Sequence, residues 1–258
     1  MTTKKIHKSP HILAKIIIGV LAVAVVSAGV ILLFSADSVG DCGDDTKQGI
    51  DVSHHQGVID WALVARSSTI KFAYIKASEG SRHQDTKYLY NTEQARAAGI
   101  AVGSYHYFHP NVPVQEQYDN FMQMVSIATQ DLIPVIDVEE RGRKPSKQIC
   151  DSLKKFTHLV ESQWGVRPII YTHQHYYNTL LQQSFDKHLL WIARYGIYKY
   201  KPHPTLEDNH PCSVWQYSNR GRIDGINGDV DLNTLCNDVE LQDILLDKSL
   251  TNTITDRL

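Results

Sequence analysis

The sequence predicts an irregular β/α barrel in which five βα units are followed by three strands without helices. Three observations lead to this class. Apolar, β-branched and aromatic runs recur eight times after residue 48, and helical patterns follow the first five of them. The last three runs are too close together for a βα crossover, which needs about a dozen residues. A flavodoxin-like open sheet is the alternative, but it leaves the helix-poor end unexplained.

The eight expected strands are short and rich in Ile, Val and aromatic residues. They are residues 49–53, 70–77, 100–108, 132–138, 167–172, 188–194, 212–217 and 229–232. No glycine-rich phosphate loop follows the first of them.

Five helices are expected between the strands. Residues 86–98 end at Gly99, which is a helix-stop signal. Ser146 is placed to cap a helix over residues 147–163, which stops before Gly165. The other three helices are expected over residues 60–67, 114–129 and 174–183.

A membrane anchor is expected ahead of the barrel. Residues 16–34 are nineteen uncharged residues, enough to cross a core of about 30 Å at about 1.5 Å per residue. All nearby lysines lie in residues 1–15, so this basic end is expected in the cytoplasm and the rest of the chain outside it, in the periplasm or the extracellular space. A cleaved signal peptide ending near Ala28 is the alternative, but the apolar run continues past that residue.

The remaining boundaries follow from composition. Residues 35–47 are small, polar and acidic and form a linker, residues 48–238 form the barrel, and residues 239–258 form a tail with an amphipathic start.

The formal net charge is −2, and removing the four lysines of residues 1–36 leaves residues 37–258 at −6. This charge excludes a nucleic-acid partner, since such proteins carry a basic face. We expect a monomer.

Four cysteines follow the apolar segment, which is compatible with two disulfides in an exported domain. Three pairings are possible. Cys42 and Cys236 flank the barrel, whose ends would be neighbours, and their pairing is the one we expect. There is no CxxC spacing for structural zinc.

The fourth expected strand turns acidic at its end. In Leu132-Ile-Pro-Val-Ile-Asp137-Val-Glu139-Glu140 an apolar run meets two carboxylates that are two residues apart. On a strand, Asp137 and Glu139 share one side with their Cα atoms roughly 6–7 Å apart. A pair of carboxylates is the usual equipment for cleaving a glycosidic bond.

Other polar and aromatic residues lie on or just after the remaining strands, where β/α barrels carry their active sites. A ring of carboxylates interleaved with aromatic faces suits a sugar polymer. Each residue alone also has a structural explanation. Asp51 could cap a helix, Glu139 could pair with Arg141 or Arg143, and the aromatic residues could be barrel core. The candidates are Asp51, Glu79, Tyr105, Tyr107, Tyr171, Trp191, Trp215, Gln216 and Asp231.

The histidines offer a metal alternative that we consider weak. The groups His54-His55, His106-x-x-His109 and His173-x-His175 could hold zinc, but none forms a specific ligand motif. We therefore expect no metal and no cofactor.

The order of these motifs resembles the glycoside hydrolase family 25 lysozymes. The matching pieces cover most of the region from 49 to 236 and are GIDVSHHQGVIDW, FAYIKASEG, GSYHYF, PVIDVEE, PIIYT, WIARY, VWQYS and IDGINGDVDLN. The resemblance implies the same irregular barrel. It also implies an N-acetylmuramidase that hydrolyses the β-1,4 bond between N-acetylmuramic acid and N-acetylglucosamine in peptidoglycan.

The resemblance also implies roles for four acids. Glu139 matches the general acid/base, expected to be protonated in a partly desolvated cleft, and Asp137 matches the residue that stabilises the substrate's N-acetyl group. Asp51 and Asp231 match the other two acids, with Asp229 as the alternative to Asp231. Attack by the N-acetyl carbonyl would give net retention.

Two classes of alternative stay open at this point. One is a catalytically silent barrel that binds glycans. The other is a different carbohydrate enzyme, either a chitinase-like glucosaminidase with the same D-x-E logic or a metal-dependent deacetylase.

Overall fold

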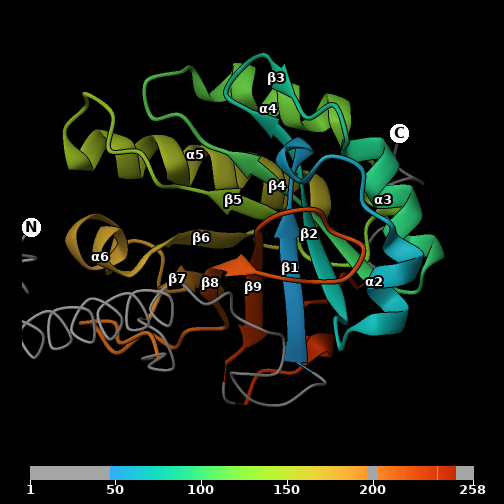
Figure 1. Cartoon of the computed structure of the whole chain (residues 1–258). Coiled ribbons are helices and arrows are strands. Elements are labelled where there is room, and N and C mark those ends of the chain that lie inside the picture. The colour runs from blue at the N-terminus through green and yellow to red at the C-terminus, as the bar shows by residue number, and fades with distance from the viewer. Residues whose placement is uncertain (1–46, 197–202, 237, 248–258) are drawn as a thin grey trace, which may run out of the picture.

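A computed structural model describes residues 47–196, 203–236 and 238–247, and in these residues eight strands close a barrel (Figure 1). The strand order around it is β1-β9-β8-β7-β6-β5-β4-β2, and β1 also pairs with β2, which closes the ring. The strands are β1 Gln48–Val52, β2 Phe72–Glu79, β4 Ala101–Tyr107, β5 Val135–Asp137, β6 Ile169–His173, β7 Leu190–Ala193, β8 Val214–Gly221 and β9 Val230–Leu235. The predicted α/β barrel is thus confirmed.

One strand of the barrel runs against the others. Strands β1, β2 and β4 to β8 are parallel to their neighbours, whereas β9 is antiparallel to both β8 and β1. The start of β9 therefore reaches the rim at which the other strands end. Asp231, near the start of β9, lies opposite Asp51 of β1 in the register. An additional short strand, β3 His83–Gln84, pairs with the end of β2 and was not predicted.

Helices follow the strands of the first half, and in Figure 1 they extend around the barrel from the right, over the top, to the upper left. Several shorter helical segments occur in the loops. The α-helices are α2 Trp61–Ser67, α3 Tyr88–Ala97, α4 Val114–Met124, α5 Ser146–Trp164 and α6 Gln174–Tyr176, and the other helices are η2 His54–Gln56, η3 Ile127–Thr129, η4 Tyr177–Leu181 and η5 Leu241–Ile244.

Three details of the predicted helices need correction. Ser146 is the first residue of α5 and not its cap, because Pro145 takes the cap position without a side-chain hydrogen bond. The expected helix over 114–129 breaks after Met124, where Val125 is extended, and resumes as η3. The expected helix over 174–183 is a single α-turn followed by a π-helix. Gly165 does end α5, with a positive φ of 69° that suits glycine.

Large aromatic side chains fill the interior of the barrel. The rings of Tyr74 and Trp191 lie 5.0 Å apart, and the Tyr74 hydroxyl donates to the Ile133 carbonyl at 3.1 Å. The Tyr74 ring occupies the space in which Gly103 would carry a Cβ, so a larger residue there would clash.

The two ends of the chain are only partly described. Residues 1–46 and 248–258, which include the expected anchor at 16–34, nearly all of the expected linker at 35–47, and Cys42, lie outside the described residues. None of the helices in the described part of the chain is long and apolar enough to cross a membrane. The start of the expected tail packs on the barrel. The Ile133 N–H donates to the Ile244 carbonyl, and the Leu246 N–H donates to the Asp131 carbonyl, each at 2.9 Å.

Candidate active site

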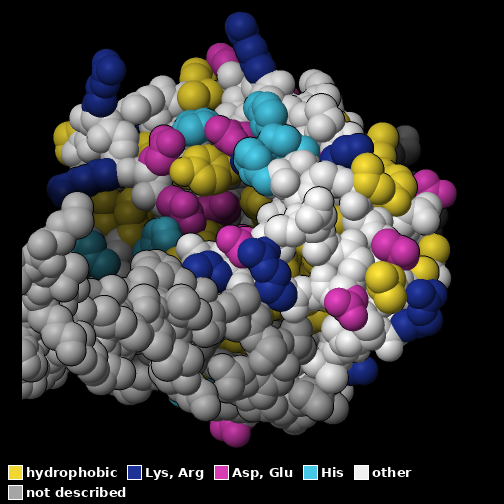
Figure 2. Space-filling view, viewed as in Figure 1, with side chains coloured by type: hydrophobic (Ala, Val, Ile, Leu, Met, Phe, Trp, Pro, Cys, Tyr) yellow, Lys and Arg dark blue, Asp and Glu magenta, His cyan; other side chains and the backbone are white. Residues whose placement is uncertain are grey.

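A cavity of about 410 Å³ opens at the rim where the parallel strands end. Figure 2 shows acidic side chains gathered beside hydrophobic and histidine side chains in a hollow on this face. Nine of the residues singled out from the sequence line the cavity, namely Asp51, Tyr105, Tyr107, Asp137, Glu139, Tyr171, Trp191, Gln216 and Asp231.

Asp137 and Glu139 reach the cavity from the end of β5, on the same side, as their spacing predicts. Asp137 is buried, and its Oδ1 atom has no hydrogen-bond partner within the described residues. Burial, followed by the negative charge of Glu139, raises the pKa of Asp137 well above its usual range. Of the two carboxyl groups, Asp137 is therefore the one whose neutral form is favoured by its surroundings.

Glu139 has a different environment, which the sequence did not predict. Burial raises its pKa, but the hydrogen bond and the charge of His173 outweigh that effect and hold the pKa of Glu139 below its usual value. The His173 Nε2 and Glu139 Oε1 atoms are 3.3 Å apart, and this contact also raises the pKa of His173. The expectation that Glu139 is protonated in the free cleft is not supported, because its contact with His173 lowers its pKa.

Asp51 and Asp231 form the opposite wall of the cavity. Asp51 Oδ2 accepts hydrogen bonds from Gln216 Nε2 at 2.9 Å and from Asn233 Nδ2 at 2.8 Å. Burial nevertheless raises the pKa of Asp51 to about 6. Burial and the charges of Asp51 and Glu139 raise the pKa of Asp231 to about 8. The wall thus holds at least one proton near neutral pH.

A hydrogen-bonded group of side chains fixes this wall. Gln216 Oε1 accepts from the hydroxyls of Tyr171 at 2.9 Å and Tyr195 at 2.6 Å, and it turns its amide nitrogen to Asp51. Trp191 Nε1 donates to Asn233 Oδ1 at 2.9 Å, which likewise turns that amide nitrogen to Asp51. Both amides are thereby oriented to donate to a carboxylate.

Two predicted substrate-binding residues do not line the cavity. Glu79 turns away to pair with Lys76 at 2.6 Å and with His109 at 2.9 Å. Trp215 is buried on the other side of β8, where its Nε1 donates to the Arg194 carbonyl at 2.9 Å. Lys76 takes the place in the lining where we expected Glu79.

Seven further residues that were not among the substrate-binding candidates also line the cavity, and of these His55 and His173 were considered only as metal ligands. The seven are Ser53, His55, Gln56, Lys76, His173, Tyr195 and Asn219. A signal for His173 existed, since it lies two residues after Tyr171 and shares its side of β6. Tyr195 follows β7 in a loop, where strand alternation carries no information.

Position also bears on two assignments that the sequence left open. Asp231 lines the cavity, whereas Asp229 forms an exposed ion pair with Arg222 at 2.7 Å. The His106-x-x-His109 pair, considered from the sequence as a weak metal alternative, is split, because His106 is buried against Phe156 outside the barrel, with ring centroids 5.1 Å apart.

Comparison with known proteins agrees with this geometry. The family described as Glycosyl hydrolases family 25 matches residues 50–226. Lysozyme M1 of Streptomyces globisporus is 33% identical over 213 residues, which cover 76% of this chain and 70% of that protein. The protein YegX of Escherichia coli K12 is 38% identical over 199 residues, with 76% and 71% of the two chains covered.

Solved structures show the same fold. A bacterial lysozyme from Streptomyces coelicolor superposes with a TM-score of 0.67 at 30% identity, covering 81% of this chain and 98% of that one. A family 25 glycosyl hydrolase from Bacillus anthracis also gives a TM-score of 0.67, at 28% identity, with 80% and 92% covered.

Proposed function

The chain belongs to the glycosyl hydrolases of family 25, and from this membership we infer that it is a lysozyme, a hydrolase of the glycan strands of peptidoglycan. The bond that we propose it cleaves is the β-1,4 bond between N-acetylmuramic acid and N-acetylglucosamine. The observation that carries the proposal is the cavity itself, in which Asp137 and Glu139 face Asp51 and Asp231 among aromatic side chains.

Glu139 acts as general acid and base in this proposal. It is the less buried member of the pair at the end of β5, and the donor to a leaving oxygen must be reachable by substrate. In the free cleft His173 keeps Glu139 ionised, so a bound sugar must first replace His173 as its hydrogen-bond partner. Loss of the imidazolium and exclusion of water then both raise the pKa of Glu139.

The nucleophile is the substrate's own N-acetyl oxygen. As Glu139 gives its proton to the glycosidic oxygen, the bond from that oxygen to the anomeric carbon breaks and the acetamido oxygen bonds to the carbon. Asp137 stabilises the resulting oxazolinium ion. Water, deprotonated by Glu139, then opens the ring and restores the proton to Glu139, with net retention. Asp51 and Asp231 hold the hydroxyls and the amide of the bound sugars in place.

Peptidoglycan lies outside the cytoplasm, so the barrel acts there, as a monomer. The apolar segment at 16–34 is the proposed anchor. Protease added to intact cells digests an anchored, exported barrel, and digestion only after lysis would contradict this topology.

The experiment that tests the activity uses the purified protein and intact peptidoglycan. Released fragments are reduced with borohydride, and the new reducing ends are identified by mass spectrometry. Muramitol ends that are absent with Glu139→Gln support the proposal. Glucosaminitol ends would indicate a glucosaminidase, and glycan binding without any cleavage would indicate a silent barrel.

A further inference from the structure

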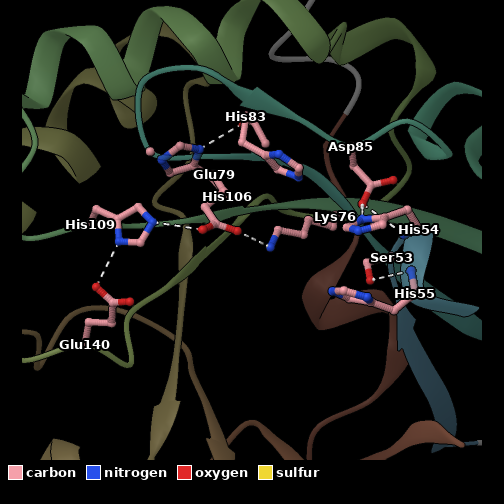
Figure 3. A network of polar contacts seen from close by, with 12 residues as sticks. Ser53, His54, His55, Lys76, Glu79, His83, Asp85, His106, His109 and Glu140 are labelled. Atoms are coloured by element: carbon pink, nitrogen blue, oxygen red, sulfur yellow. Dashed lines mark hydrogen bonds and ion pairs between the residues drawn. The ribbon is translucent and has the colours of Figure 1, made fainter.

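Beside the cleft, three side chains from the first two βα units converge. His54 opens η2 just after β1, His83 lies on β3, and Asp85 follows β3. One donor atom from each side chain lies within 4.8 Å of the other two (Figure 3). None of the three belongs to the lining of the carboxylate cavity.

Asp85 is the fixed member of this cluster. Its side chain has no exposed surface, and its Oδ1 accepts from the Lys87 backbone at 2.9 Å. Its Oδ2 accepts from the His54 backbone at 2.9 Å and lies 2.7 Å from His54 Nδ1. A structural ion pair would account for these two residues alone.

The ion pair between His54 and Asp85 does not explain why His83 lies beside them. Its imidazole has no hydrogen bond or ion pair with another described residue, yet its ring centroid lies 5.7 Å from that of His54. The position is set by the backbone, since His83 pairs with Glu79 across β2 and β3 and its carbonyl accepts from Asn120 Nδ2 at 3.0 Å. A third donor is thus held close to the His54–Asp85 pair.

We propose that His54, His83 and Asp85 form a zinc site. Two imidazoles and one carboxylate are a donor set that Zn²⁺ prefers, with water in the fourth position of a tetrahedron. Ca²⁺ and Mg²⁺ prefer oxygen ligands and are disfavoured by the two imidazoles. On binding, the metal replaces the proton between His54 Nδ1 and Asp85 Oδ2, so binding releases a proton when that nitrogen carries one.

The site joins two parts of the rim. Asp85 and His83 extend from the β2–β3 hairpin, whereas His54 begins the turn in which Ser53, His55 and Gln56 line the cleft. Zinc therefore fastens the hairpin to a wall of the cleft. This role is separate from hydrolysis and does not depend on the proposed function.

Zinc binding is measured by calorimetry on the full chain after removal of metal with a chelator. The wild type binds one equivalent of Zn²⁺ at this site. His83→Ala and Asp85→Asn each weaken binding at least about 10- to 100-fold, the range for losing even an outer partner of a metal site. His158→Ala removes an exposed histidine from α5 and is the matched control that keeps wild-type affinity.

A spectroscopic readout separates this site from other histidines. Co²⁺ added in place of zinc gives the intense visible absorption of a tetrahedral site in the wild type and in His158→Ala, and not in His83→Ala. Melting curves in chelator check that His83→Ala folds as the wild type does, as expected for an exposed side chain. Equal zinc affinity of wild type and His83→Ala, or equal loss in His158→Ala, would overturn the proposal.

Discussion

At the residue scale, two neighbouring carboxylates differ because of one imidazole. Asp137 is buried without a cationic hydrogen-bond partner, and Glu139 faces His173. Burial favours the neutral acid in the first case, and the imidazolium favours the anion in the second. The free site therefore keeps the proton away from its proposed acid until substrate arrives.

Replacing Glu139 by Gln removes the proton donor and keeps the shape of the side chain. We expect the turnover of peptidoglycan to fall at least about 100-fold, the lower end of what general acid catalysis contributes. Glu140→Gln is the control, because that neighbouring side chain is 47% exposed and pairs with His109. Turbidity and reducing-end assays measure both variants, and near-normal turnover of Glu139→Gln would reject the assignment.

Replacing His173 by Asn tests the electrostatic role of the imidazole. Without His173 the pKa of Glu139 rises, since that hydrogen bond and charge hold it down. A general acid works only while protonated, so the decline of kcat/KM on the alkaline side moves to higher pH. His175→Asn, which removes an exposed histidine two residues further on, leaves the profile unchanged. An unshifted profile for His173→Asn would show that His173 does not tune the acid.

At the element scale, strand alternation determined which predictions succeeded. Asp137 and Glu139 lie two residues apart and both face the cavity, as a period of two requires. The same period places Trp215 and Gln216 on opposite sides of β8, so our expectation of both in the cleft conflicted with the strand assigned to them. Glu79 ends β2 where the register with β4 shifts at a bulge, which the sequence does not reveal.

Contacts across the chain were harder to predict than the elements. The five βα units and three final strands follow from local patterns, and the structure matches them within a few residues. The pairing of His173 with Glu139, and that of His54 with Asp85, join residues of different units. Such contacts depend on side-chain packing, which no periodicity encodes.

Two cysteines lie next to each other where β8 begins and β9 ends, and their positions predict a disulfide. Cys212 and Cys236 are free thiols whose Sγ atoms lie 2.8 Å apart, and the Cys236 backbone N–H donates to the Ser213 carbonyl at 3.0 Å. In an oxidising compartment we expect a Cys212–Cys236 disulfide in place of the Cys42–Cys236 pairing expected from the sequence. Closing this loop stabilises the fold by about 3 kcal/mol in the chain-entropy account.

Peptide mapping without reduction measures this pairing directly. A linked peptide that contains both cysteines and disappears on reduction supports it, and Cys212→Ser abolishes that peptide. Recovery of a Cys42–Cys236 peptide from the exported protein would restore the original pairing.

At the scale of the whole molecule, the active site weakens the fold that carries it. Four carboxylates meet in one cavity of about 410 Å³, with Lys76 as a cation in its lining. Burial and mutual repulsion raise the pKa of three of them, Asp51, Asp137 and Asp231, so the folded protein holds protons that the unfolded chain releases. The barrel must tolerate this strain through the packing of the rest of its core.

The raised pKa of Asp231 predicts how the stability of the protein depends on pH. The pKa of Asp231 is about 8 in the folded protein and 3.8 ordinarily, so its stabilising contribution is complete below pH 3.8 and is lost as the pH rises towards 8. Asp231→Asn has no carboxyl group to ionise, so it does not lose stability in this way as the pH rises. At pH 4 the variant and the wild type should melt at similar temperatures. At pH 8 the variant should be more stable by more than about 1.4 kcal/mol, the value of one pKa unit, or about 3 °C or more in Tm.

Calorimetric melts at pH 4, 6 and 8 measure this difference, and activity is assayed on the same samples. Asp229→Asn is the matched control, since that side chain lies at the surface in an ion pair with Arg222. A stability difference between Asp231→Asn and the wild type that is the same at all three pH values would contradict the prediction. A difference that grows with pH, with activity lost, would show that the protein keeps this carboxylate for function at the expense of stability.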